Sequence, residues 1–202
     1  MDKIAKNEEQ IDTNLQQNMI DFRDRLAETA VAREKEAHAL MLGLLAEEHV
    51  VFIGPPGTAK SMLVENMIDA LKGASIFKQL MSKFTTPEQV FGPVKVSGLM
   101  DDKFEREVTG RAADCHFFFV DEVFKSSDVM LNGMLTLLNE RKFDNGGVRC
   151  DTPLMMTVGA SNELPESDAL HALWDRFLIR VHVDYIEDDT VMASFLRDYD
   201  PV

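Results

Sequence analysis

Residues 54–61 read GPPGTAKS, a stretch whose residue types could bind phosphate groups. The phosphate-binding loop of many nucleotide-binding proteins is written G-x-x-x-x-G-K-[ST], and Gly54, Lys60 and Ser61 fall in register with it. Two positions depart from the pattern, because Ala59 precedes the lysine and Gly57 comes two places early. We expect Ala59 to be tolerated with a negative φ, and Gly57 to let the chain turn without a Cβ atom in the way.

The segments around this loop predict the strand and helix that the motif requires. HVVFIG (49–54) is a short apolar, β-branched run of the kind found in buried strands, and SMLVENMIDALKGA after it has a helical apolar face. Backbone N–H groups and a helix N-terminus would hold the phosphates, while the lysine reaches the β- and γ-phosphates and the hydroxyl binds Mg²⁺. The candidate phosphate-binding residues are Gly54, Pro55, Pro56, Gly57, Thr58, Ala59, Lys60, Ser61 and Met62. A tight Pro-Pro-Gly turn without a ligand is the alternative interpretation.

A pair of carboxylates follows the predicted strand HFFFVDE (116–122). Asp121, at the end of this strand, would bind Mg²⁺ together with Ser61, directly or through water. Glu122 would then polarise an attacking water molecule. Because transfer of phosphate to a substrate hydroxyl needs no water-activating glutamate, the pair favours hydrolysis.

Two further polar residues lie near the ends of later predicted elements. Asn162 ends the strand predicted over 154–162, where an amide could hold both the γ-phosphate and the attacking water; an Asx-turn is the alternative. Arg176 lies in LWDRF, just before the last predicted strand. From the residues alone, an ion pair of Arg176 with Asp175 or Glu187 is the preferred interpretation.

Five predicted strands alternate with helices along the chain, at 49–54, 75–82, 116–122, 154–162 and 178–185. This alternation predicts an α/β fold with a mostly parallel sheet and helices on both faces. Ser127 is expected to cap the helix that runs through DVMLNGMLTLLNER. Residues 92–113 predict a β-hairpin-like insertion around MDD, and residues 141–153 a hairpin that turns at Asn145–Gly147.

The composition narrows the possible partners and compartments. The chain has 202 residues, of which 45% are hydrophobic, and a formal net charge of −14. This charge argues against a nucleic-acid-binding surface and against binding to an anionic membrane surface. The two cysteines lack metal-binding spacing, and no stretch is typical of a signal peptide or a membrane span, so we expect a cytoplasmic protein.

With these elements in this order, the chain resembles AAA+ ATPases, more narrowly the MoxR family and most closely its RavA-type branch. The resemblance lies between about residues 30 and 190, in GPPGTAKS, MSKFTTPEQVFGPVKVSGL, FFFVDEVFKSS, LNERKFDNG and ASNELPESDALHALWDRFLIR. It implies a three-layer α/β/α P-loop NTPase fold with five strands in the order 5-1-4-3-2. Residues 92–113 match the helix-2 insert and residues 141–153 the hairpin before sensor 1. An alanine before the lysine is usual in this branch.

The resemblance also implies a role for each candidate residue. The matched positions are Lys60 and Ser61 for Walker A, Asp121 and Glu122 for Walker B, Asn162 for sensor 1, and Arg176 for the arginine finger. An arginine finger reaches the γ-phosphate bound by a neighbouring subunit, so the resemblance implies a homo-oligomeric ring, typically a hexamer when a helical lid is present.

The resemblance divides the chain into an N-terminal helical extension (1–28), the AAA+ α/β nucleotide-binding domain (29–190) and the start of a connection to a helical lid (191–202). We expect the lid itself not to fit in the residues that follow the fifth strand. The expected function is Mg²⁺-dependent binding and hydrolysis of ATP to ADP by a chaperone-type module that remodels or activates a protein client. The alternatives are a nucleotide-dependent binding scaffold with little hydrolysis, and a DNA-acting AAA+ motor subunit, against which the net charge argues.

Overall fold

A five-stranded parallel sheet forms the centre of the molecule, for which a computed structural model describes residues 16–29, 32–95 and 104–186. Its strands follow the order β2-β3-β6-β1-β7, and every pair is parallel. Counted along the chain, these are the five predicted strands, so the predicted order 5-1-4-3-2 is confirmed. The strands are β1 (Val50–Ile53), β2 (Ile76–Leu80), β3 (Phe117–Asp121), β6 (Met156–Ser161) and β7 (Ile179–His182).

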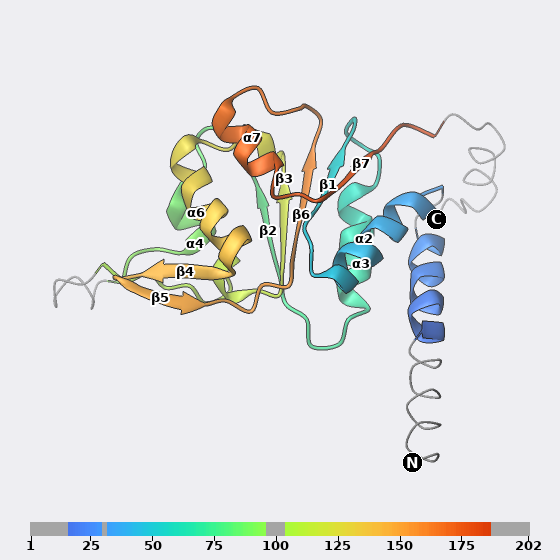
Figure 1. Ribbon diagram of the computed structural model, residues 1–202, viewed down its shortest axis with the longest axis horizontal. Helices are drawn as coiled ribbons and strands as arrows, with labels where there is room; N and C mark the ends of the chain where they lie inside the picture. Colours follow the sequence, from blue (N-terminus) through green and yellow to red (C-terminus); the bar gives the residue numbers. More distant parts are fainter. Residues whose placement is uncertain (1–15, 30–31, 96–103, 187–202) are drawn as a thin grey trace, which may run out of the picture.

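Helices cover both faces of this sheet, which confirms the three-layer α/β/α architecture (Figure 1). One face carries α2 (Glu34–Ala46) and α3 (Lys60–Asp69), and a further helix over residues 16–28 lies beside them. The other face carries α4 (Pro87–Phe91), α6 (Asp128–Glu140) and α7 (Asp168–Trp174). Short 3₁₀ turns, η1 (Ala112–Asp114) and η2 (Val123–Lys125), flank β3. Among the described residues, no helix is both long enough and apolar enough to cross a membrane.

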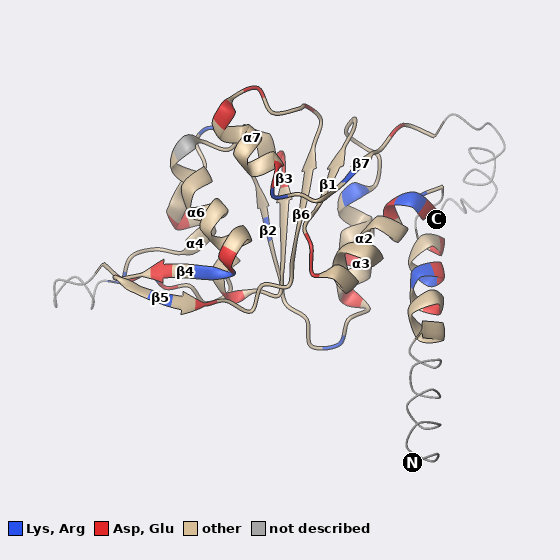
Figure 2. Cartoon of the chain, viewed as in Figure 1, with Lys and Arg blue, Asp and Glu red and all other residues tan. Residues whose placement is uncertain are grey.

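The central strands are buried on both faces, because alternate side chains enter two different hydrophobic cores. In β1, Val50 and Phe52 pack with α2 and α3, whereas Val51 and Ile53 pack with α4, α6 and α7. β3 alternates in the same way. A strand covered on both faces needs apolar residues at every position, which explains the continuous runs VVFI and FFFV. Figure 2 shows that the central strands are largely free of charged residues, whereas the helix over residues 16–28 carries both signs.

The starts of α4 and α6 differ in how their backbone N–H groups are satisfied. The Gln89 side-chain oxygen accepts a hydrogen bond of 3.0 Å from the backbone N–H of Thr86, and Pro87 begins α4. Ser127 precedes α6 as predicted, but its side chain makes no capping hydrogen bond, so the expected cap is wrong. Leaving an exposed helix start to water costs little, and the apolar face of α6 stabilises the helix instead.

A two-stranded ribbon and the predicted insertion are joined by one asparagine side chain. β4 (Lys142–Asn145) pairs antiparallel with β5 (Val148–Asp151), and the two turn glycines between them have φ of 61° and 81°. The Asn145 side chain accepts from the Arg106 N–H at 2.6 Å and donates to the Arg106 carbonyl at 3.2 Å. Val94 and Arg106 form an antiparallel bridge, which confirms hairpin-like pairing at the base of the insertion. The predicted turn around MDD lies outside the described residues.

A buried histidine ties α6 to the sheet. His49, just before β1, accepts a hydrogen bond of 3.0 Å from the Thr157 N–H at Nδ1. Its Nε2 lies 3.0 Å from the Leu138 carbonyl oxygen, which can only accept, so the neutral ring carries its proton on Nε2. Burial lowers the pKa of His49 below its ordinary value of 6.5. Protonation of Nδ1 would place its N–H against the N–H of Thr157, so that two hydrogen-bond donors would face each other in the core.

We therefore predict that His49 makes the fold sensitive to mild acid. The unfolded chain binds the proton near pH 6.5 and the folded chain only at lower pH, so the stability that His49 contributes is present above pH 6.5 and is lost as the pH falls below it. The free energy of unfolding should fall by up to about 1.4 kcal/mol between about pH 7.5 and 5.5. Urea unfolding of His49→Gln should show a weaker pH dependence, whereas the exposed control His38→Gln should behave like the wild type; equal slopes in all three proteins would contradict this role.

Candidate functional site

The first glycine of the candidate loop is required by the sheet itself. Gly54 continues β1, and its N–H donates to the Ser161 carbonyl at 3.0 Å. A Cβ atom on Gly54 would lie 1.9 Å from the carbonyl oxygen of Val183, which follows β7. No side chain fits there, so Gly54 is fixed by the close approach of backbone from β7.

The lysine of the loop is bonded to the loop's own backbone. Lys60 is the first residue of α3, and its Nζ donates to the carbonyls of Gly54 (3.0 Å) and Pro55 (2.7 Å) and to the Thr58 hydroxyl (3.0 Å). Burial lowers the pKa of Lys60, while the negative charges of Asp121 and Glu122 oppose the shift. The ammonium is therefore held at the base of the loop, close to two carboxylates.

Ala59 adopts a left-handed conformation, with φ 63° and ψ 17°, so the expectation of a negative φ is wrong. This residue precedes α3, which begins without a side-chain cap, and the left-handed turn is what leads the chain from the loop into the helix. Gly57 also has a positive φ, of 77°, but a Cβ there would meet nothing within 4 Å. Gly57 is therefore needed for its backbone conformation rather than for space.

The two carboxylates follow β3 and face different surroundings. Asp121 is the last residue of the strand, and its Oδ1 accepts from the Glu122 N–H at 3.0 Å. Glu122 has a φ of 53°, a left-handed value that turns the chain sharply into η2. Its Oε2 is buried and receives no hydrogen bond from the described residues, but it lies 3.3 Å from Nζ of Lys125.

One cavity of about 350 Å³ brings most of the candidate residues together at the carboxyl edge of the sheet. Its lining comes from the loop after β1, the end of β3 and the end of β6. The lining residues are Pro56, Gly57, Thr58, Ala59, Lys60, Ser61, Met62, Asp121, Glu122, Ser161 and Asn162. Gly54 and Pro55 take part only through their carbonyls, which hold Lys60. Ser161 is a lining residue that the sequence does not mark, because a small residue inside an apolar strand carries no motif.

Arg176 lies outside this cavity, in the turn between α7 and β7. Its side chain is exposed and makes no ion pair or hydrogen bond with the described residues. Asp175, the partner preferred from the residues alone, instead lies 3.4 Å from Arg180, which stacks over Trp174, so that expectation is wrong. Glu187 lies outside the described residues. A single chain therefore brings Lys60, Asp121, Glu122 and Asn162 together, but not Arg176.

The residues in the cavity fit a nucleotide phosphate with Mg²⁺. An uncapped ten-residue helix begins at the cavity, and an ammonium and a hydroxyl stand in its first turn. The described residues contain no cluster of three His, Cys, Asp or Glu side chains that could enclose a metal ion. Mg²⁺ is commonly bound by one or two protein oxygens together with waters and substrate phosphates, and Ser61 and Asp121 match that pattern.

A family model described as the MoxR domain in MoxR-vWA-beta-propeller ternary systems matches residues 17–198 of the chain. The uncharacterized protein MJ0812 of Methanocaldococcus jannaschii is 40% identical over 160 residues, which is 79% of this chain and 43% of that protein. The chaperone MoxR1 of Mycobacterium tuberculosis is 24% identical over 159 residues, 77% of this chain and 41% of the relative. The chain thus spans about two-fifths of the length of these relatives.

The fold is also found in a crystal structure of a protein from Cytophaga hutchinsonii that is named as a candidate ATPase. It superposes with a TM-score of 0.68 at 18% identity, over 92% of this chain and 58% of that chain. The TM-score confirms the fold, and the low identity limits the conclusion to the fold alone.

We predict that Ala59→Gly stabilises the protein, since a left-handed conformation costs a residue with a Cβ about 1–2 kcal/mol. The greater freedom of glycine in the unfolded chain offsets part of this gain, which leaves about 0.5–1 kcal/mol, or roughly 1–4 °C in Tm. The matched control is Ala70→Gly, at a helix end with φ −78°, which should lower stability by about 0.5 kcal/mol. Thermal unfolding that shows the same loss for both variants would exclude the left-handed conformation of Ala59.

Proposed function

Because the chain belongs to the MoxR family of AAA+ ATPases, we propose that its cavity at the carboxyl edge of the sheet binds ATP with Mg²⁺ and hydrolyses it. One observation carries this proposal: Lys60, Ser61, Asp121, Glu122 and Asn162, from three separate stretches of sequence, line a single cavity. An ammonium, a metal-binding pair, a carboxylate and an amide are the groups that hydrolysis of a phosphoanhydride requires.

Each side chain has a role that follows from its position. Lys60 exchanges the carbonyls of Gly54 and Pro55 for phosphate oxygens, and the N–H groups around residues 57–61 hold the phosphates. Ser61 and Asp121 hold Mg²⁺, which when bound neutralises charge that develops on the phosphate oxygens.

The remaining two side chains act on water. The Glu122 carboxylate accepts a proton from the attacking water, and the Asn162 side-chain amide orients that water beside the γ-phosphate. Both residues line the cavity, and both follow the last residue of a strand. The sheet therefore sets the backbone positions from which the two side chains reach the cavity.

Arg176 completes the site of a neighbouring copy in a homo-oligomeric ring, for which a hexamer is our proposal. An exposed guanidinium without an ion pair among the described residues is available to another chain. Removing an arginine that stabilises the transition state costs a large factor in rate, so an isolated chain would bind ATP but turn it over slowly. This observation also supports the second candidate function, a nucleotide-dependent binding scaffold, for a single chain.

We further propose that nucleotide turnover remodels or activates protein partners, with ATP and ADP as alternating ligands. The matching family is described by ternary systems of MoxR, vWA and β-propeller proteins, so a partner of the vWA or β-propeller kind is the first to test. The narrower likeness to the RavA-type branch, the three-part division of the chain and a cytoplasmic location remain predictions.

The central experiment measures ATP turnover and ATP binding of Glu122→Gln. Loss of the base should lower kcat by about 10²–10⁴-fold and leave the Kd for ATP within about twofold of the wild type. Lys60→Met should lose ATP binding itself, because the phosphates lose their cation. The control is Glu65→Gln on α3, an exposed glutamate that pairs with Lys78 and should behave like the wild type. Unchanged hydrolysis by Glu122→Gln would exclude Glu122 as the base.

The ring proposal is tested by mixing two inactive variants. Arg176→Ala should lower kcat by about 10³-fold or more with little change in the Kd for ATP. A mixture with Glu122→Gln should regain part of the activity, because the Glu122→Gln subunit still supplies Arg176 to its neighbour. The control is Arg23→Ala, a partly exposed arginine that pairs with the neighbouring Asp24 away from the cavity. No recovery in the mixture, together with a monomeric mass in the presence of ATP and Mg²⁺, would contradict an arginine that acts between subunits.

A further inference from the structure

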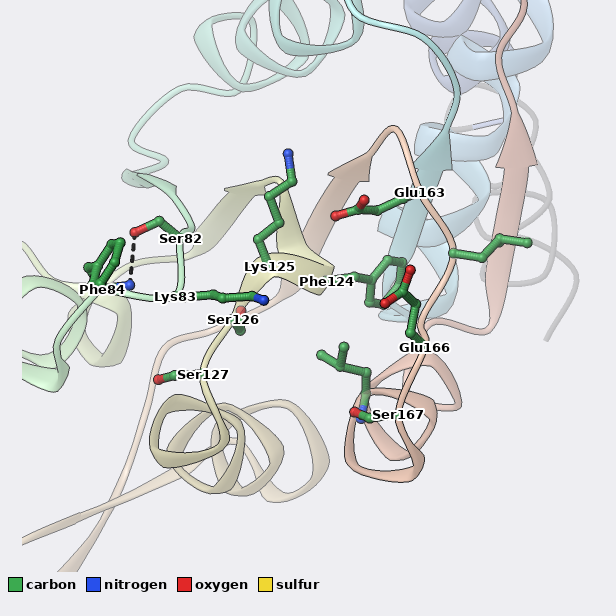
Figure 3. A pocket seen from close by; sticks show the side chains of 12 residues that line it. Ser82, Lys83, Phe84, Phe124, Lys125, Ser126, Ser127, Glu163, Glu166 and Ser167 are labelled. Carbon is green, nitrogen blue, oxygen red and sulfur yellow. Dashed lines mark hydrogen bonds between the residues drawn. The ribbon is translucent and has the colours of Figure 1, made fainter.

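Glu122 and Lys125 form an ion pair between two neighbouring cavities. Nζ of Lys125 lies 3.3 Å from Oε2 of Glu122, and the two side chains are 39% and 22% exposed. Glu122 lines the 350 Å³ cavity described above, whereas Lys125 lines a second cavity of about 760 Å³. Figure 3 shows this larger cavity, with Lys125 between the loop of Ser82–Phe84 and the loop that carries Glu163 and Glu166.

The turn between the two residues holds the pair in place. The Lys125 N–H donates to the Glu122 carbonyl at 2.9 Å, and the Ser126 hydroxyl donates to the Val123 carbonyl at 2.7 Å. Val123 and Phe124 are buried in the core beside α6 and α7. These contacts fix the backbone positions of Glu122 and Lys125, so the two side chains leave the turn from neighbouring points.

The carboxylate oxygen at this contact has the Lys125 ammonium as its charged neighbour. Oε2 of Glu122 is buried and receives no hydrogen bond from any described residue, so the Lys125 ammonium supplies the compensation for its charge. A general base must direct a free lone pair at the proton it accepts. While Oε2 lies against the ammonium, that oxygen is turned toward a cation rather than toward a water on the γ-phosphate.

We propose that Lys125 is a positioning residue that holds Glu122 in an idle orientation and so sets the rate of hydrolysis. The inference rests on the proposed role of Glu122 as the base. Hydrolysis requires the Glu122 side chain to leave Lys125, and the energy of the ion pair adds to the barrier. For a partly exposed pair this amounts to about a two- to fivefold reduction in kcat.

The test compares Lys125→Met and Lys125→Arg in the full chain with ATP and Mg²⁺. Lys125→Met keeps the length of the side chain without the charge, and it should raise kcat about two- to fivefold while the Kd for ATP stays within about twofold. Lys125→Arg restores the cation and should return kcat to the wild-type value. If Lys125 had a purely structural role, Lys125→Met would not raise kcat, and the kcat of Lys125→Arg would have no reason to match the wild-type value.

The matched control is Lys142→Met on β4, which removes a lysine of similar exposure whose ion pair, with Asp151 at 3.4 Å, lies away from the cavity. Its kcat should equal that of the wild type. The double variant Glu122→Gln with Lys125→Met should be as slow as Glu122→Gln alone, because Lys125 acts only through Glu122. Thermal unfolding of each variant checks that the fold is retained.

The outcomes separate this inference from the proposed function. If Glu122→Gln is inactive and Lys125→Met is unchanged or slower than the wild type, Lys125 does not restrain the base, although the ATPase mechanism stands. If Glu122→Gln hydrolyses ATP like the wild type, the base is misassigned and both proposals fail. If ATP binds but neither the wild type nor Lys125→Met turns it over, the restraint by Lys125 is likewise overturned.

Discussion

The parallel alignment of β1 between β6 and β7 is the constraint on which the rest of the structure depends. Parallel strands end at the same edge of a sheet, so the chain segments after β1, β3 and β6 must leave from neighbouring points. The ladder continues past the regular strands, where Gly54 donates to Ser161 and Val183 donates to Ile53. The backbone approaches so closely at this point that only glycine fits at position 54. The position of the candidate loop is thus set by packing within the sheet.

Two residues at this edge carry backbone strain, and both lie at the candidate site. Ala59 and Glu122 have left-handed φ values of 63° and 53°, which cost a residue with a Cβ about 1–2 kcal/mol each. A domain whose net stability is about 5–15 kcal/mol can carry this cost when two full hydrophobic cores support it. In return, the left-handed turn at Ala59 starts α3 beside the cavity, and the one at Glu122 turns the carboxylate into it. Strain of this kind is typical of functional sites, where the surrounding packing imposes the conformation.

At the end of the sheet away from the cavity, the β4–β5 ribbon is held to the base of the insertion. The β4–β5 ribbon lies toward the opposite end of the sheet from the cavity (Figure 1), and the Asn145 side chain holds it to the base of the insertion. α6 connects the two ends, since it begins shortly after Lys125 and leads directly into β4. His49 in turn fixes the carbonyl of Leu138, near the end of α6, to the start of β1. α6 thus joins the carboxyl edge of the sheet, next to η2, to the ribbon at the other end.

The order of apolar runs and polar residues along the chain is enough to predict the sheet and most of the cavity. Short apolar runs rich in β-branched and aromatic residues, such as VVFI and FFFV, favour strands buried on two faces, and polar residues after such strands meet at one edge of a parallel sheet. That rule and the family resemblance together select the candidate residues Lys60, Ser61, Asp121, Glu122 and Asn162. The ribbon was predictable as a hairpin because glycines mark its turn, and the insertion because short alternating pieces surround MDD.

Only the tertiary structure decided the features that depend on contacts between distant segments. The reason for Gly54 is the carbonyl of Val183, and the partner of Asp175 is Arg180 rather than Arg176. The left-handed φ of Ala59 reverses the local preference of alanine, because the loop must join β1 to α3 in the space that the sheet leaves. The neutral state of His49 and the pairing of Glu122 with Lys125 depend on burial and on distances of about 3 Å, which neither composition nor spacing encodes. Local patterns specify elements, whereas the charge and orientation of single side chains are set by the neighbours that folding brings to them.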